Sequence, residues 1–403
     1  MQRQLADAVL KTFDDAVEEQ HFAALNHFST QDWAESYRWL DANGLALYFL
    51  DRVKRLGVES ALPPVVLARL EQNMADSRER TAENFAEFVR VSRASQESGI
   101  SHIHIKGFAT SADACPDPAL RLQLDLDFLA PIQDAERCSE ILRGFDYFLT
   151  MKSDDVWEFK SNLASMPQHA DLYKPTRQRS IDMHIMAEGI KMPQRRWQER
   201  IGFRFPVLRE CDRFLQHADH VMHHLNGEWV RLSWLLELRR NVMARSGDEV
   251  FWSQVRQRTD DSSRVAIGAS IAMATIAFGE FASAELKSWT VDMLDRRMRL
   301  WIKRYGREVV LADFPGTKLY LLQPSTGVSG LGATKKRREL LLPLHRIPRV
   351  VRLTETEDWW TRMHALMAQI SFAMFRLRFH LTEGWRYLLE APRWKRIVKA
   401  EQQ

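Results

Sequence analysis

Two aspartates, Asp125 and Asp127, carry the strongest chemical signal in this sequence. They alternate with apolar residues in the stretch that runs from Arg121 to Leu129. In an extended strand, successive side chains point to opposite faces, so both carboxylates project from one face. The apolar partners expected to enter a core are Leu124, Leu126 and Phe128. Two carboxylates this close repel each other unless a cation or a proton lies between them, and Mg²⁺ suits carboxylate and phosphate oxygens.

A segment before the acid pair shows the same alternation. Between Gly99 and Gly107, isoleucines alternate with the polar residues His102, His104 and Lys106. The pattern predicts a strand with one polar face that runs into a tight glycine turn. Gly107 suits such a turn, because a Cβ hinders a backbone that approaches phosphates closely or adopts a positive φ.

A segment after the acid pair supplies a third carboxylate. Residues 180–185 place Asp182 and His184 on one face and apolar side chains on the other. If the three strands are neighbours, Asp125, Asp127 and Asp182 converge. The sequence therefore predicts a site with three carboxylates.

The elements around these strands are predicted to be mostly helical. Apolar periodicity indicates helices before residue 98, including a long one over Val65–Ser98, and again from about residue 194. Another helix is expected over Asp134–Arg143, a strand over Phe145–Thr150, and a buried helix over Val265–Phe278. Residues 312–333 are rich in Gly, Pro, Ser and Thr and read as a long loop, with further helices from Trp359 onward.

These patterns predict an α+β fold, with a small mixed sheet embedded in N- and C-terminal helices. Four regions are expected: a helical region at 1–98, an α/β core at 99–190, a helical region packed on the core at 191–311, and a loop with a basic helical region at 312–403. At 403 residues, 45% hydrophobic and 27% charged, the chain is typical of globular proteins with a large core.

Composition excludes several classes of protein. The three cysteines, Cys115, Cys138 and Cys211, lack metal-ligand spacing and fit a reducing, cytoplasmic setting. The first residues carry acidic side chains and no long apolar core, so no signal peptide is expected. The most apolar run is too short to suggest a transmembrane segment.

The order of these motifs resembles the polymerase-β-like nucleotidyltransferase superfamily. More closely, the chain is similar to uncharacterised bacterial nucleotidyltransferases over roughly residues 25–245. The likeness is carried by Ile105-Lys106-Gly107, by Arg121 followed by Asp125 and Asp127, and by Asp182-Met183-His184. The chain departs from the superfamily in having Phe108 where a serine or glycine usually follows the turn glycine, and Ser111 lies too far along to replace it.

The resemblance implies a role for each site residue. Asp125 and Asp127 would bridge two Mg²⁺ ions (or Mn²⁺), roughly 3.5–4 Å apart, and Asp182 would bind one of them. The reaction would be attack on the α-phosphate of a nucleoside triphosphate such as ATP, with transfer of the nucleoside monophosphate. The acceptor is unidentified: a small molecule, peptide, glycan or protein. Lys106 and Gly107 would meet phosphates, and Arg121 would pair with a phosphate or with the acid cluster itself. His184 would orient a carboxylate, assist metal binding from outside the ligand set, or accept a proton.

Other interpretations remain open at the level of sequence. The donor could be a nucleotide sugar used on a phosphorylated peptide or a polysaccharide precursor, or the chain could be a catalytically silent binding module. A basic run from Lys335 to Arg338, followed by His345, Arg346, Arg349 and Arg352, could bind nucleic acid, a lipid surface or another polyanion. The histidines 217, 220, 223 and 224 follow helical spacing and suggest zinc only weakly, without a completing ligand.

Overall fold

The computed structural model of the chain describes residues 3–16, 19–161, 172–175, 179–324, 339–342 and 359–401. The chain forms two compact units. Unit 1 comprises residues 1–45, 218–246 and 258–403, and unit 2 comprises residues 46–217 and 247–257. The α+β fold expected from the sequence is confirmed. The four sequence regions stay a prediction, and the basic run at 335–338, with His345 and Arg346–Arg352, lies outside the described residues.

Unit 2 contains a mixed seven-stranded sheet in the order β3-β4-β5-β2-β1-β7-β6. Strands β2 and β5 run parallel, as do β1 and β7, and the other neighbours are antiparallel. The strands are β1 (Ile103–His104), β2 (Asp125–Pro131), β3 (Phe148–Lys152), β4 (Val156–Lys160), β5 (Ser180–Met186), β6 (Arg195–Arg200) and β7 (Phe203–Leu208).

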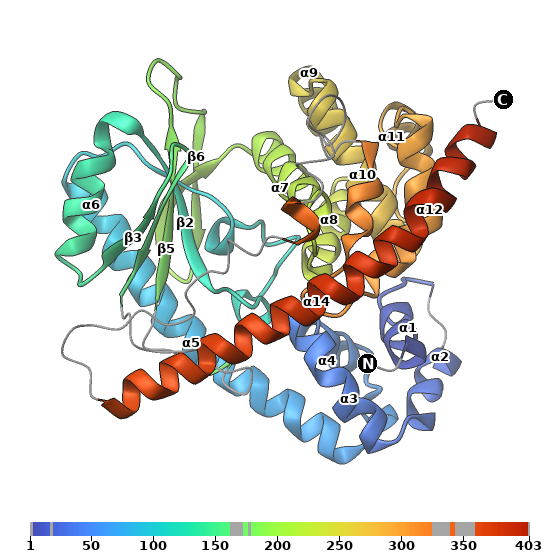
Figure 1. Cartoon of the computed structure of the whole chain (residues 1–403). Coiled ribbons are helices and arrows are strands. Elements are labelled where there is room, and N and C mark those ends of the chain that lie inside the picture. The colour runs from blue at the N-terminus through green and yellow to red at the C-terminus, as the bar shows by residue number, and fades with distance from the viewer. Residues whose placement is uncertain are drawn as a thin grey trace. The chain divides into compact units, whose positions relative to one another are not determined.

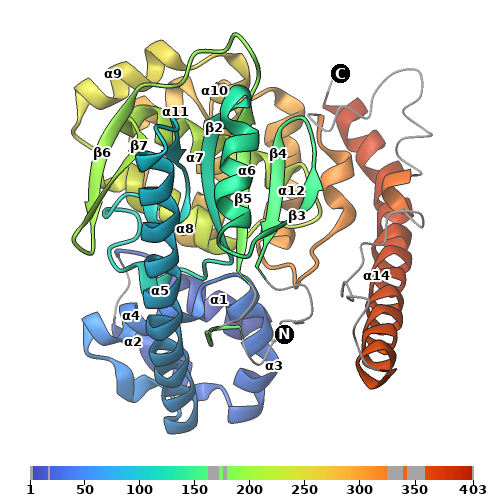
Figure 2. The same ribbon diagram turned by 90° about the vertical axis from the view of Figure 1, so that its left-hand side faces the viewer.

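Two helices cover one face of this sheet, α5 (Pro64–Glu97) and α6 (Ala135–Arg143). Figure 2 shows both helices in front of the strands. Phe88 of α5 packs on Phe108 and Phe205, with ring centroids 5.2 and 4.7 Å apart, and Leu142 of α6 joins the same core. Apolar side chains of β2, β4, β5 and β7 are therefore buried with these helices in one core.

Helix α5 has clear local causes. It begins at Pro64, whose fixed φ suits the first helical position, and it ends where Gly99 adopts a φ of +67°. The Ile100 N–H then donates to the Ser95 carbonyl at 2.9 Å, which satisfies a group that the helix end leaves open. The remaining elements of unit 2 are α4 (Ala46–Leu56), α9 (Glu249–Arg258) and the short 3₁₀ turns η2 (Glu59–Ala61), η3 (Gly107–Ala109), η4 (Pro118–Leu120) and η5 (Ile132–Asp134).

The regular elements described in unit 1 are all helices, joined by turns and loops (Figure 1). Its central helix is α10 (Asp261–Phe278), which is buried nearly all round, as expected from its apolar sequence. One of the points at which the chain passes between the units falls within α7 (Glu210–Leu225). The other helices are α1 (Arg3–Lys11), α2 (Glu19–Ala23), η1 (Ala24–His27), α3 (Thr30–Ala42), α8 (Leu232–Ala244), α11 (Ala284–Trp289), α12 (Arg296–Val310), η7 (Lys318–Leu322) and α14 (Trp359–Ala400).

The expectation of a loop over 312–333 is wrong for residues 318–322, because Lys318–Leu322 form the buried turn η7. Lys318 is buried there and donates to Glu228 at 2.5 Å. The same carboxylate pairs with Arg376 of α14 at 2.9 Å. A buried lysine needs such a partner. The ion pair with Glu228 therefore holds Lys318 in place, although the amino-acid composition of the segment is typical of a loop. None of the described helices is long and apolar enough to cross a membrane.

Candidate active site

The register of β2 and β5 brings the predicted acids to one face of the sheet. Asp127 lies directly opposite Asp182 on the neighbouring parallel strand, and Asp125 lies opposite Ser180. Paired residues share a face, and so do residues two apart on one strand. Asp125, Asp127 and Asp182 therefore project from the same face, as predicted.

A fourth carboxylate, which was not predicted from the sequence, lies beside them. Glu158 of β4 lies opposite Asp182 on the other side of β5. The alternation of Trp157 and Phe159 with Glu158 was a readable signal of a half-buried strand, but the order of strands in the sheet was not. Glu158 is held by Lys160 at 2.8 Å and by the Thr150 hydroxyl at 2.9 Å.

Lys106 reaches this face through an unusual backbone conformation. Simple alternation places its side chain with that of His104, which points to the opposite face because His104 pairs with Phe128. Lys106 instead adopts a φ of 58° and a ψ of −164°, a region that residues other than glycine rarely occupy. Its ammonium lies 2.7 Å from Asp127 Oδ1 as a result. The strained backbone of Lys106 therefore places one cation among the acids.

Gly107 follows and turns the chain into η3. It has a φ of 45°, and a Cβ at this position would lie 2.4 Å from the Gln123 amide nitrogen. That amide donates to the Asp125 carbonyl at 3.0 Å, just where β2 begins. The absence of a side chain at Gly107 therefore allows the turn to pack closely against the start of the acid-bearing strand.

His184 completes the contacts of Asp127. Its Nε2 lies 3.0 Å from Asp127 Oδ1 and 3.5 Å from the Lys106 ammonium. The tautomer that carries its proton on Nε2 donates to the carboxylate. His184 and Lys106 thus hold the buried Asp127 carboxylate in one orientation.

The electrostatics separate the two opposed aspartates. Burial alone would raise the pKa of Asp127, but the hydrogen bond from His184 and the charge of Lys106 outweigh it and hold this pKa below its ordinary value. The pKa of Asp182 is raised to about 7, first by burial and then by Asp125, Asp127 and Glu158. Negative charge therefore exceeds positive charge around Asp182.

Arg121 lies just before the acid-bearing strand, whereas His102 and His104 are buried. Arg121 is half-buried, follows η4 and precedes β2, so it lies next in sequence to the site. His102 and His104 do not form a polar face, contrary to expectation. Both are buried, and the His104 ring lies 4.2 Å from the Phe88 ring while its Nε2 contacts the Ser92 hydroxyl at 3.1 Å.

Three residues next to the acid-bearing strand and the turn have structural surroundings that differ: Leu124, Phe108 and Ser111. Leu124 precedes β2 and is 45% exposed, so only Leu126 and Phe128 of the three apolar partners enter the core. Phe108 is a core residue that packs against Phe85 at 5.1 Å, which explains why a bulky residue follows the turn glycine. Ser111 closes a local turn by accepting from the Ala114 N–H, so its hydroxyl serves the backbone.

The donor chemistry of the acid site fits a hard divalent cation. Carboxylate oxygens are the ligands Mg²⁺ prefers, and the raised pKa of Asp182 reflects negative charge that a cation would neutralise. Within the described ranges, however, no group of three or more His, Cys, Asp or Glu side chains is already spaced to hold a metal ion. The same finding covers the histidines of α7. The Lys106 ammonium currently makes the closest cationic contact to Asp127.

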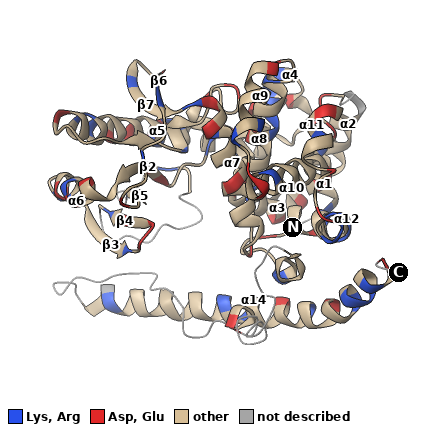
Figure 3. Cartoon of the chain, turned by 90° about the horizontal axis from the view of Figure 1, so that it is seen from above, with Lys and Arg blue, Asp and Glu red and all other residues tan. Residues whose placement is uncertain are grey.

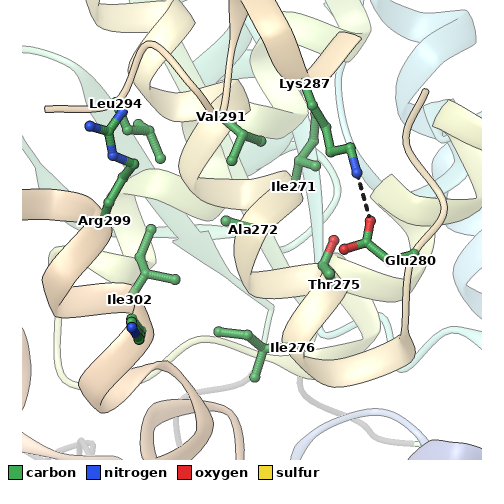
Figure 4. Close-up of a pocket in the computed structure, with 11 residues that line it drawn as sticks. Ile271, Ala272, Thr275, Ile276, Glu280, Lys287, Val291, Leu294, Arg299 and Ile302 are labelled. Atoms are coloured by element: carbon green, nitrogen blue, oxygen red, sulfur yellow. Dashed lines mark hydrogen bonds and ion pairs between the residues drawn. The ribbon is translucent and has the colours of Figure 1, made fainter. Parts of the chain in front are cut away.

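Two cavities lie elsewhere in the molecule. One of about 310 Å³ in unit 1 is lined by apolar side chains of α10 and α12, and the Lys287–Glu280 ion pair lies at its edge (Figure 4). Another of about 460 Å³ in unit 2 is lined by residues of α4, α5 and η4, including Asp51, Arg55 and Arg78. Neither of these two cavities contains the acids of β2 and β5.

Comparison with known proteins gives one match. A family model described as an uncharacterised nucleotidyltransferase matches residues 29–275, which is most of the chain. No curated protein matches the chain. The matched range includes every residue of the acid site and ends within α10, so α14 lies beyond it.

Proposed function

The chain belongs to this family of uncharacterised nucleotidyltransferases, and we propose that it transfers a nucleoside monophosphate from a nucleoside triphosphate to an acceptor. The observation that supports the proposal is the convergence of Asp125, Asp127 and Asp182 on one face of β2 and β5, with Lys106 turned towards them. We propose further that this family is part of the polymerase-β-like nucleotidyltransferase superfamily. The protein would act in the cytoplasm of a bacterium.

Asp125, Asp127 and Asp182 would hold Mg²⁺, or Mn²⁺ in its place. When bound, the ions would neutralise charge on the phosphates and lower the pKa of the attacking hydroxyl. Glu158 lies opposite Asp182 and adds to the negative charge that attracts a cation. The carboxylates would thus bind the metal, and the metal in turn would attract the negatively charged phosphates of the nucleotide.

The neighbouring residues have separate roles in this proposal. Lys106 is a mobile point charge next to the acids, and the phosphates of a nucleotide would give its ammonium a second anionic partner. Arg121 would contact the same phosphates. Gly107 lets the turn pack closely against the start of β2, and His184 positions Asp127 by hydrogen bonding. His184 acts through that carboxylate, so it is a positioning residue.

A donor-binding panel tests the proposal. Thermal unfolding would be followed with Mg²⁺ and each nucleoside triphosphate, with nucleotide sugars, and with neither. We expect a triphosphate with Mg²⁺ to raise the melting temperature of the wild type, and Asp125→Asn/Asp127→Asn to abolish the effect. Asp154→Asn, an exposed aspartate of the β3–β4 turn, is the matched control.

Each other outcome counts against the proposal in a different way. Stabilisation by nucleotide sugars but by no triphosphate would favour a sugar transferase that uses the same acids. Stabilisation by neither class, with or without Mg²⁺, would favour a silent interaction module. An equal response of the wild type and the double variant would remove the acids from the binding site.

A further inference from the structure

Helix α14 presents a long apolar surface that nothing described in the chain covers. Exposed apolar residues recur every three or four positions between Trp359 and Leu389, among them Met363, Met367, Met374, Leu381, Trp385 and Leu388. At 3.6 residues per turn, these exposed Trp, Met, Leu and Ile residues fall within a single stripe roughly 140° wide. Met374 and Trp385 are each 65% exposed, and Leu381 is 57% exposed. We call this surface the apolar stripe.

The opposite face of α14 packs against other elements of unit 1. Phe379, Tyr387 and Trp394 are buried there. Arg376 pairs with Glu228 at 2.9 Å, and the Tyr305 hydroxyl donates to Glu390 at 3.1 Å. The helix therefore has a docked face and a free face, and the apolar stripe is not a core surface exposed by a detached helix.

The acidic residues of α14 both lie on its docked face. They are Glu383 and Glu390, and Glu383 accepts from the Thr317 hydroxyl at 2.6 Å. Exposed basic residues instead lie on or beside the stripe: Arg378, and then Lys395, Arg396 and Lys399 where the stripe ends. Figure 3 shows the blue residues gathered towards the C-terminal end of α14. The free face carries positive charge and no acid.

We propose that the free face of α14 binds the surface of an anionic phospholipid membrane, with the helix lying in the plane of the interface. An apolar stripe with tryptophans, bordered by Lys and Arg, is the composition of interfacial helices. Positive charge without acids complements anionic headgroups, and a second copy of the same face would bring like charges together in a parallel pair. The helix lies outside residues 29–275, so this surface is additional to the matched nucleotidyltransferase family region.

Vesicle sedimentation of the full chain tests this proposal. Wild-type protein would be mixed with vesicles of phosphatidylcholine containing phosphatidylglycerol, and separately with pure phosphatidylcholine. We expect binding to the anionic vesicles that is stronger by about tenfold or more and that falls with added salt. The variant Met374→Gln/Leu381→Gln/Trp385→Gln should lose binding, because it removes apolar contacts while leaving the docked face intact.

Two matched variants separate the contributions. Lys395→Gln/Arg396→Gln/Lys399→Gln should abolish the preference for phosphatidylglycerol. Trp197→Gln/Ile201→Gln alters exposed apolar residues of unit 2 and should bind as the wild type does. Circular dichroism of each variant confirms that the fold is retained.

Three results would overturn the proposal. The wild type could stay in the supernatant with anionic vesicles, or the stripe variant could sediment as well as the wild type. Light scattering without lipid could also show a wild-type dimer that the stripe variant dissociates, which would assign the stripe to a second copy of the chain. The donor-binding panel does not involve α14, so failure here leaves the proposed function standing.

Discussion

Asp127 and Asp182 lie directly opposite each other on parallel strands, yet their surroundings favour different charge states. Lys106 and His184 both contact Asp127 Oδ1, and they hold its pKa below the ordinary value. Among the described residues, no side chain donates a hydrogen bond to Asp182, and burial with nearby acids raises its pKa to about 7. Positive charge therefore stabilises the ionised form of Asp127, whereas negative charge predominates around Asp182.

This asymmetry predicts opposite effects of two similar substitutions. Without divalent ions at about pH 8, Asp182→Asn should raise the free energy of unfolding by about 1–2 kcal/mol, because it removes a charge that is poorly tolerated. Asp127→Asn should lower it by about 2–3 kcal/mol, because it leaves Lys106 without its buried partner. Urea unfolding of both variants measures the difference. A loss of stability in both would contradict the charge assignment.

The gain from Asp182→Asn should depend on pH in a defined direction. The pKa of Asp182 is about 7 in the folded chain and near 3.8 when unfolded, so the folded state binds more protons between these values. The wild type then loses stability through this group as pH rises from about 4 to 7, and the loss is complete above about pH 7. The advantage of the variant should vanish below about pH 4. A constant advantage across this range would refute the raised pKa.

Lys106 offers a test of backbone strain. Glycine normally destabilises a chain relative to alanine, but at a φ of 58° and a ψ of −164° the order should reverse. We expect Lys106→Gly to be more stable than Lys106→Ala by about 1–2 kcal/mol, since both lose the ion pair and only alanine keeps the strain. Denaturant unfolding of the two variants gives the comparison. If Lys106→Ala proves the more stable, the turn is not strained.

Gly107 and Gln123 should be energetically coupled. Gly107→Ala should destabilise the protein by about 1–3 kcal/mol, because the new Cβ would overlap the Gln123 amide. In the Gln123→Ala background the penalty should shrink to the part caused by the positive φ. A double-mutant cycle on unfolding free energies isolates this term, and additive effects would show that the two residues do not press on each other.

His380 predicts a second pH effect, in unit 1. Burial, together with the charges of Lys318 and Arg376, lowers the pKa of His380 to about 4. Its folded pKa lies below the unfolded value of 6.5, so the stability it contributes is present above about pH 6.5 and is lost as pH falls towards 4. His380→Gln should lose less stability than the wild type over this window. Equal losses in parallel unfolding series would assign the titration to other groups.

The sequence predicted the acid-bearing strands well because their alternation was regular. Leu126 and Phe128 on one face, with Asp125 and Asp127 on the other, needed no tertiary information. The same rule was wrong for His102 and His104, because alternation cannot distinguish a solvated polar face from a buried one lined by Phe88. Alternation placed Lys106 on the same face as these histidines, whereas it reaches the acids through a positive φ that has no sequence signal in a non-glycine residue.

Other features depended on contacts between distant parts of the chain. Glu158 was missed because the order of strands, which sets β4 beside β5, cannot be read from the strand sequence itself. Lys318 was assigned to a loop because its burial depends on Glu228 and Arg376, far away in the sequence. Helical structure from Trp359 onward was predicted, but the division of α14 into a docked and a free face required the structure.

Transfer of label from an α-³²P-labelled nucleoside triphosphate would demonstrate directly that the protein transfers a nucleoside monophosphate. Wild type, Asp125→Asn/Asp127→Asn and the control Asp154→Asn would each be incubated with Mg²⁺, one triphosphate at a time and a lysate of the host cell as the source of acceptor. We expect label on a discrete species with the wild type and the control, and none with the double variant. Equal labelling by the double variant, or no labelling by the wild type with any triphosphate, would contradict this expectation.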